Sequence, residues 1–309
     1  MGSCSRSAAG TGYARQGDME TTPDLTVAER IRTSFGELTR AERQLANVII
    51  ENYPVSGLGS ITAIAQTSGV STATVARTAR KLGFEGFPEL QAALRSELEA
   101  IVSSPITKHD HWAEKAPDTH ILNRFADAVL ENLRQTLRHL NPETFGAVVG
   151  LLCEPQRAVH VVGGRITHAL ADYFFTHMQV MRSGMTLIPS NSSTWPQYVL
   201  NMRAGDVLVA FDIRRYERDI QRLAEMATAK GATLVLFTDQ WGSPATKLAT
   251  HSIHSRIEAP SAWDSSVVTL FIVEAVIAAV QDASWKEART RMDALEELFD
   301  RAKLFRKFT

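Results

Sequence analysis

The sequence predicts an all-α helix-turn-helix domain followed by an α/β domain, a doubly wound parallel sheet with helices on both faces. Two observations support this fold class. Residues 61–82 carry small, turn-forming and apolar residues at the spacing of a helix-turn-helix. In the second half of the chain, short apolar or β-branched runs alternate with helical stretches. With 309 residues, the chain is long enough for two hydrophobic cores.

Composition divides the chain into four parts. The predicted parts are a disordered tail (1–26), a helix-turn-helix domain (27–100), a linker (101–116) and an α/β domain (117–309). The tail is rich in small and polar residues and has no apolar block typical of a signal peptide. The linker is polar and contains prolines. His109 and His111 within it lack further ligands, so we interpret them as solvated residues rather than a metal site.

A support helix opens the helical domain. Thr39 and Glu42 form a predicted capping box, in which each side chain bonds the backbone of the other residue. The apolar stripe of Leu45 and Ile49 follows, and the helix is expected to end before Pro54.

The helix-turn-helix itself is predicted from steric requirements. Ala65 is small where two helices cross, Gly69 supplies the unhindered backbone that the turn needs, and Val75 fills the angle between the helices. Ser71 is the expected N-cap of the second helix. The outer face of that helix is expected to carry Thr72, Thr74, Ala76, Arg77, Arg80 and Lys81. Such a helix suits the major groove of DNA, with its first residues at base edges and its basic residues at phosphates.

Charge placement supports a nucleic-acid partner. The net charge of the chain is only −1, but no Asp or Glu lies between Glu51 and Glu85. The predicted DNA contacts are Ser71, Thr72, Thr74, Arg77, Arg80 and Lys81. The alternative is a solvated basic face on an ordinary helical hairpin.

The helical domain resembles a known family. The matching residues are Leu38-Thr39 with Glu42, Ile61 with Ala65, the run Gly69 to Val75, Arg77, Lys81 to Phe84, Gly86-Phe87 and Leu90. Over about residues 30–98 they resemble the N-terminal domain of the RpiR/MurR family of bacterial transcription regulators. The resemblance implies a sugar isomerase (SIS) domain in the second half and operator DNA as a partner.

The α/β half shows five candidate strands. They are Arg157 to Gly163, Thr186 to Ile188, Val207 to Phe211, Thr233 to Phe237 and Ser252 to Ile257. The helical stretches between and after them are Ile166 to Met181, Glu217 to Lys230 and Ser265 to Ala283. Ligands of such sheets bind beyond the carboxyl ends of the strands, so the residues after each strand are the candidate site.

The loop after the first strand has the features of an anion site. Gly163 and Gly164 allow backbone amides to approach an anion at the start of a helix. A dinucleotide site is excluded because the third glycine and the acidic residue after the next strand are missing. The loop resembles the first βα loop of SIS domains, in which Gly163 and Thr167 match the family pattern and Arg165 replaces a usual glycine.

The loop after the third strand departs from the SIS pattern. A hydroxyl-rich turn is usual there, whereas this chain has Asp212, Arg214, Arg215 and Glu217. The arginines can act as bidentate anion donors, or Asp212 and Glu217 can neutralise them in a structural network. The Thr238-Asp239 and Ser243-Pro244 pairs still resemble the family.

The resulting interpretation is a regulator tuned by a small anionic metabolite such as a sugar phosphate or sugar acid. The predicted effector residues are Gly163, Gly164, Arg165, Thr167, Asp212, Arg214, Arg215, Thr238 and Ser243. A second hypothesis is an SIS-domain sugar-phosphate isomerase with an accessory DNA-binding domain, whose acid–base candidates are His168, Glu217, His254 and Glu258. A third is an oligomerisation module with an inactive pocket.

Further expectations concern partners and location. We expect a homodimer or homotetramer, because one helix-turn-helix reads only a half-site. Residues 285–308 are a candidate interface helix, and the alternative is a helix packed against its own domain. No catalytic residue, cofactor or metal is predicted. The two cysteines cannot form a disulfide framework, and the apolar run Val267 to Val280 is too short for a bilayer, so a cytoplasmic location is expected.

Overall fold

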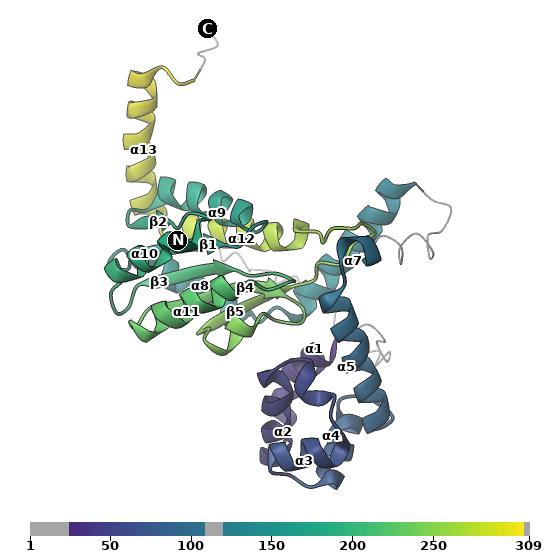
Figure 1. Cartoon of the computed structure of the whole chain (residues 1–309). Helices are drawn as coiled ribbons and strands as arrows, with labels where there is room; N and C mark the ends of the chain where they lie inside the picture. The colour runs from purple at the N-terminus through teal and green to yellow at the C-terminus, as the bar shows by residue number, and fades with distance from the viewer. Residues whose placement is uncertain (1–24, 109–119, 306–309) are drawn as a thin grey trace, which may run out of the picture.

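The computed structural model describes residues 25–108 and 120–305. A small helical domain and a larger α/β domain are joined through the long helix α5 (Figure 1). Most of the predicted tail and the two linker histidines lie outside the described residues.

The helical domain contains the predicted helix-turn-helix. Its helices are α1 (Val27–Ser34), α2 (Arg40–Glu51), α3 (Ile61–Ser68), α4 (Thr72–Lys81) and α5 (Phe87–Val102). The capping box of Thr39 and Glu42 is confirmed at the start of α2. Ala65 is 4% exposed and Val75 is fully buried, as the helix crossing requires. Helix α1 was not predicted from the sequence, although Thr26 and Glu29 form a second capping box there.

The α/β domain is built on a five-stranded sheet in the order β2-β1-β3-β4-β5, with every pair parallel. The strands are β1 (Val159–Gly163), β2 (Met185–Leu187), β3 (Val207–Phe211), β4 (Thr233–Asp239) and β5 (His251–Ser255). Each predicted strand is therefore present, with ends shifted by at most two residues. The central strands β1 and β3 are buried at every position, which is why they appear in the sequence as continuous apolar runs.

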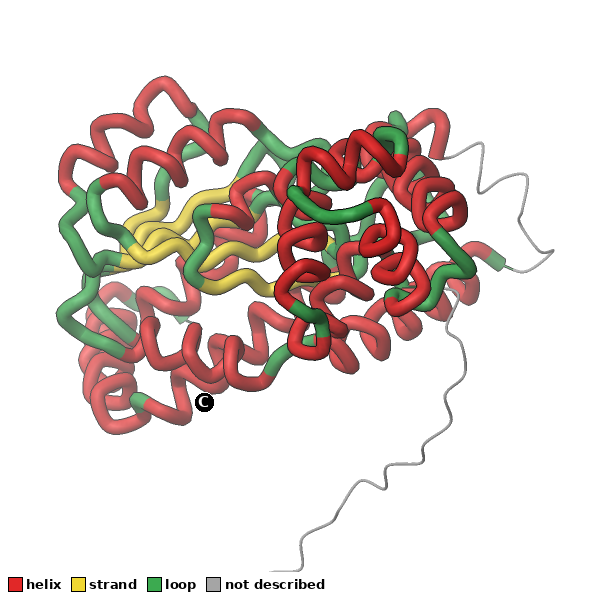
Figure 2. The backbone as a smooth tube through the Cα atoms, turned by 90° about the horizontal axis from the view of Figure 1, so that it is seen from below, coloured by secondary structure: helices red, strands yellow, loops and turns green. Residues whose placement is uncertain are grey.

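Helices cover both faces of the sheet, and the sheet lies between two helical layers (Figure 2). They are α7 (Ile121–His139), α8 (Pro142–Cys153), α9 (His168–Met181), α10 (Trp195–Asn201), α11 (Arg218–Ala229), α12 (Val267–Ala283) and α13 (Trp285–Ala302). One hydrophobic core joins α8, α9 and α12 to one face, and the other joins α10 and α11 to the opposite face. Helices α7, α8 and α10 were not predicted.

The strand order creates a topological switch point between β1 and β3. The chain leaves β1 towards α9 on one face and leaves β3 towards α11 on the other. The loops after these two strands therefore diverge and leave a crevice between them, where ligands of such sheets bind.

The C-terminal helix α13 projects away from the α/β domain (Figure 1). Ala288 is its only buried residue. Among the described residues, no single helix is long and apolar enough to cross a membrane. The pair α12 and α13 reaches that length and composition together but is bent by 98° at its junction.

Candidate functional site

The predicted DNA-binding surface is formed by α3, α4 and the turn between them. Gly69 ends α3 in the left-handed region at φ 63°, and its N–H donates to the carbonyls of Ala65 and Gln66. The Ser71 hydroxyl caps α4 by accepting from the N–H of Thr74 at 3.1 Å. The predicted turn geometry and cap are confirmed.

Four of the six predicted DNA contacts are exposed. Ser71, Thr72, Arg77 and Arg80 all lie on the outer surface of the helical domain. They come from the first three turns of α4, so a groove-binding orientation would present them together.

Thr74 and Lys81 differ from the prediction. Thr74 is only 6% exposed, so its placement on the outer face was wrong. Its hydroxyl turns towards Ser71, 3.0 Å away, because it completes the cap rather than pointing outwards. The Lys81 ammonium donates to the Glu42 carboxylate at 3.1 Å and to the Glu37 carbonyl at 2.7 Å, which ties it to α2.

The predicted effector residues gather at the switch point around a cavity of about 660 Å³, here called the strand-end cavity. Arg165 and Thr167 line it from the loop after β1, and Asp212, Arg214 and Arg215 line it from the loop after β3. The remaining four predicted residues, Gly163, Gly164, Thr238 and Ser243, do not line it. The structure thus brings five of nine predicted residues to one cavity.

The glycine loop is already satisfied internally. The N–H of Gly164 donates to the Thr167 hydroxyl at 2.8 Å, and the N–H of Arg165 donates to the Glu217 carboxylate at 2.6 Å. The expected open backbone cradle for an anion is therefore wrong, because a hydroxyl and a carboxylate of the chain itself occupy its donors. The carboxylate lies so close that a Cβ on Gly164 would be 2.5 Å from Glu217 Oε1.

Asp212 points into the protein rather than at the arginines. It accepts from the N–H of Glu217 at 3.1 Å and from the Ser243 hydroxyl. Burial, together with the nearby Asp239 and Glu217 carboxylates, raises the pKa of Asp212 to about 7. The interpretation of Asp212 as the neutralising partner of Arg214 is therefore wrong.

The ion-pair partner of Arg214 is Asp264, a residue that was not predicted from the sequence. The guanidinium lies 3.2 Å from the Asp264 carboxylate, donates to the Ser103 hydroxyl and stacks over the Trp241 ring at 5.3 Å. Lys108 contacts the same Asp264 carboxylate at 2.5 Å. Arg165 and Arg215 are exposed and have no ion pair within residues 25–108 and 120–305.

The segment predicted as a linker forms one wall of the strand-end cavity. Ser103, Pro105 and Lys108 follow directly after α5 of the helical domain and line the cavity opposite the strand ends. No sequence signal pairs Lys108 with Asp264, because 156 positions separate them. The described part of the linker is therefore packed against the α/β domain.

The acid–base candidates of the isomerase hypothesis are scattered. Only Glu217 lines the strand-end cavity. His254 lies elsewhere, bonded to the Asp239 carbonyl and Ser252, and burial lowers its pKa to about 3. In the described ranges, no group of three or more His, Cys, Asp or Glu side chains is placed to hold a metal ion.

Comparison with known proteins agrees with this arrangement. Residues 25–100 match the helix-turn-helix domain of the rpiR family, and residues 153–279 match the SIS domain. The regulator HexR of Pseudomonas aeruginosa is 26% identical over 226 residues, covering 72% of this chain and 76% of HexR. An uncharacterized HTH-type transcriptional regulator of Clostridium perfringens is 23% identical over 270 residues, covering 85% and 95%.

Solved structures share the fold. The sugar isomerase domain of an RpiR transcription factor from Sphaerobacter thermophilus superposes with a TM-score of 0.55 at 21% identity, covering 58% of this chain and 99% of that domain. Vibrio vulnificus NanR, solved in complex with ManNAc-6P, gives a TM-score of 0.52 at 17% identity and covers 91% of this chain and all of NanR.

Proposed function

The chain belongs to the rpiR family of transcriptional regulators, with a helix-turn-helix and a SIS domain, and on this premise we propose that a small anionic metabolite in the strand-end cavity controls its binding to operator DNA. In this proposal Arg77 contacts base edges and Arg80 contacts phosphates. Lys81 is less available for DNA contact because its ammonium forms an ion pair with Glu42 of α2. A protein that binds chromosomal DNA in this way would act in the cytoplasm.

One observation carries the proposal: residues that follow the DNA-binding domain directly form a wall of the ligand cavity. Ser103 contacts Arg214, and Lys108 contacts Asp264, so both ends of the Arg214–Asp264 pair are bonded to the segment after α5. An anion that enters the cavity competes with Asp264 for its cationic partners. Anion binding would therefore change the contacts between the segment after α5 and the α/β domain. Such a difference in contacts between the free and the ligand-bound state is what allostery requires.

The charge of the cavity supports an anion as effector. Arg165 and Arg215 reach it as exposed guanidinium groups, which can hold phosphate or carboxylate through two parallel hydrogen bonds. The bound ligand of NanR is the sugar phosphate ManNAc-6P. By analogy, we propose a sugar phosphate or sugar acid for this chain. Glu217 already occupies the loop amides, so the ligand must displace it or bind beside it, and we expect modest affinity.

A role as an isomerase has less support. General acid–base catalysis needs two groups within reach of one substrate. Among the four candidates, only Glu217 reaches the strand-end cavity, and it is bonded to the Arg165 amide. We therefore propose that the SIS domain binds its ligand without turning it over.

The proposal is tested by ligand screening of the full chain. Sugar phosphates, starting with ManNAc-6P, and sugar acids are added during thermal unfolding, since a ligand of the folded state raises the melting temperature. Any hit should change operator affinity, and a tenfold change corresponds to about 1.4 kcal/mol of coupling. Arg165→Ala should remove the effect of the ligand on melting temperature and operator affinity, and leave DNA binding intact. Arg222→Ala, an exposed position of α11, should change neither. A response that survives in Arg165→Ala would contradict the assigned cavity.

A further inference from the structure

We propose that the cleft between the two domains is a second anion-binding site, for a small phosphate- or carboxylate-bearing molecule that also carries hydroxyl groups. This interdomain cavity measures about 530 Å³ and shares no lining residue with the strand-end cavity. Its walls come from α1 of the helical domain and from α7, α8, β5 and the end of β4 of the α/β domain. A molecule bound there touches both domains.

The cavity has an excess of positive charge. Arg32 lines it from α1, Arg138 from the end of α7 and Arg256 from the residue after β5, whereas Glu29 is the only acidic one among the described residues that line it. Burial lowers the pKa of His139 on the same wall; the Glu29 carboxylate opposes this shift, and the charges of the three arginines add to it. The first turn of α8 lines the cavity too, but it carries the acidic Glu143, and its first amides already donate to the Asn141 side chain, so the excess of positive charge comes from the arginines.

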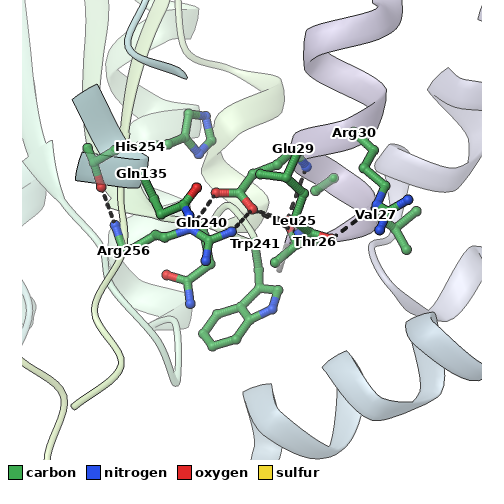
Figure 3. Close-up of polar contacts among 12 residues, drawn as sticks. Leu25, Thr26, Val27, Glu29, Arg30, Gln135, Gln240, Trp241, His254 and Arg256 are labelled. Atoms are coloured by element: carbon green, nitrogen blue, oxygen red, sulfur yellow. Dashed lines mark hydrogen bonds and ion pairs between the residues drawn. The ribbon is translucent and has the colours of Figure 1, made fainter. Parts of the chain in front are cut away.

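One of the three arginines already holds a carboxylate. The Arg256 guanidinium bonds the Glu29 carboxylate at 2.6 Å and 3.1 Å through two nitrogens (Figure 3). Glu29 thus neutralises Arg256. Arg32 lies in the field of the Glu29, Asp239 and Glu97 carboxylates but forms no ion pair with any of them among the described residues. Arg32 donates to the neutral carbonyl of Gln240 at 2.5 Å, and Arg138 has no ion pair in the part of the chain that the structure describes. Arg32 and Arg138 are therefore the donors for an added anion.

The hydroxyl requirement comes from Gln240. This residue lines the interdomain cavity and is 2% exposed, yet its amide oxygen has no hydrogen-bond partner among the residues that the structure describes. An unsatisfied buried acceptor costs about 1–3 kcal/mol, and a ligand hydroxyl would supply the missing donor. The two arginines and the unsatisfied Gln240 oxygen together favour a polyol phosphate or a hydroxy acid over a bare inorganic anion.

Titration calorimetry on the full chain tests the site, with inorganic phosphate and glycerol phosphate as probes. Both should bind, glycerol phosphate more tightly, and Arg32→Gln and Arg138→Gln should each weaken binding by tenfold or more. Arg134→Gln is the matched control, because Arg134 lies one turn earlier on α7, is exposed and pairs with Glu131. Arg32→Lys, which keeps the charge, should retain part of the affinity, and thermal unfolding confirms that each variant is folded.

The outcomes separate this site from the effector site. Binding that is lost in Arg165→Gln but unchanged in Arg32→Gln and Arg138→Gln would assign the anion to the strand-end cavity and overturn the inference. Absence of binding by both probes to the unmodified chain would overturn it as well. Binding that survives in Arg165→Gln and is lost in Arg32→Gln and Arg138→Gln supports the interdomain site. This outcome does not depend on whether an effector binds in the strand-end cavity.

Discussion

The Glu29 carboxylate and the Arg256 guanidinium form a two-point ion pair that joins the DNA-binding domain to the α/β domain (Figure 3). Both side chains are nearly buried, at 8% and 12% exposure. Glu29 also accepts from the backbone N–H of Thr26, at 2.9 Å, so the same carboxylate caps α1 and holds it against β5. One carboxylate therefore both caps α1 and contributes to the interface between the domains, beside the Arg32 bond to the Gln240 carbonyl.

Breaking this pair should loosen the domain interface. We expect Glu29→Gln and Arg256→Gln each to destabilise the chain by up to about 3–5 kcal/mol, because each leaves a buried charge without its partner. The double variant should be less destabilised than the sum of the two. A double-mutant cycle in thermal or urea unfolding measures this coupling, and the exposed pair Glu131–Arg134 provides the control, with an expected coupling below about 1 kcal/mol. Equal coupling in the two cycles would contradict a structural role for the interdomain pair.

The two halves of the chain were predictable for different reasons. The helix-turn-helix follows from local chemistry: Gly69 is needed at positive φ, and Ser71 is a hydroxyl at an N-cap. The sheet follows from continuous apolar runs, because strands buried on both faces need no polar positions. The missed helix α1 had a usable signal in its capping box at Thr26.

The details of the cavity were not predictable, because they depend on contacts between distant residues. Proximity in sequence suggested Asp212 as the partner of Arg214, but the turn carries Arg215 at φ 65° and sends Asp212 inward to Ser243. The true partner, Asp264, is 50 positions away. Nothing in a polar, proline-containing segment indicated that Lys108 would pack against it.

The outer face of α4 gives a prediction about specificity. Arg77→Ala should reduce discrimination between operator and other DNA by about 1–3 kcal/mol, because Arg77 follows the first turn, where side chains reach base edges. Arg80→Ala should weaken all DNA binding and lower the salt slope by about 1, as expected for one lost phosphate contact. Fluorescence anisotropy at several salt concentrations measures both. Unchanged binding in both variants would remove α4 as the recognition helix.

Lys81 is expected to behave differently from Arg80. Its ammonium bonds Glu42 and the Glu37 carbonyl, so Lys81→Ala removes contacts between α4 and α2 as well as a surface charge. We expect a lower melting temperature in Lys81→Ala and an unchanged one in Arg80→Ala, because the Arg80 side chain makes no such contact with the described residues. Thermal unfolding without DNA distinguishes the two cases.

Helix α13 gives a prediction about assembly. It projects from the α/β domain with Trp285 48% exposed and Leu298 56% exposed, although its sequence has apolar residues at helical spacing. We expect these side chains to be covered by a second copy, so that Leu298→Glu shifts the full chain from dimer or tetramer towards monomer. Light scattering at micromolar concentration measures this, and Thr290→Glu, at an exposed position of the same helix, is the control for one added negative charge. A monomeric unmodified chain would contradict the prediction.

The buried Asp212 predicts an unusual pH dependence of stability. Its pKa is about 7 in the folded chain against an ordinary value of 3.8, so between these values the folded state keeps a proton that the unfolded state has lost. The contribution of Asp212 to the free energy of unfolding should therefore fall as the pH rises from about 4 to about 7. The fall is up to about 4 kcal/mol for a difference of about three pKa units. The loss should be complete above pH 7, where both states are ionised.

Asp212→Asn should remove this dependence, because an amide has no proton to lose. The substitution sacrifices part of the bonding to Ser243 and the Glu217 amide, which costs about 1 kcal/mol at any pH. The variant should consequently be less stable than the unmodified chain at about pH 4 and more stable at about pH 8, because the relief from burying a charge then exceeds the lost bond. Melting temperatures across this range test the crossover. Asp219→Asn, at an exposed side chain of α11, is the control and should show no crossover. Parallel curves for the Asp212 variant and the unmodified chain would mean that Asp212 is ionised throughout, held so by its hydrogen bonds despite its burial.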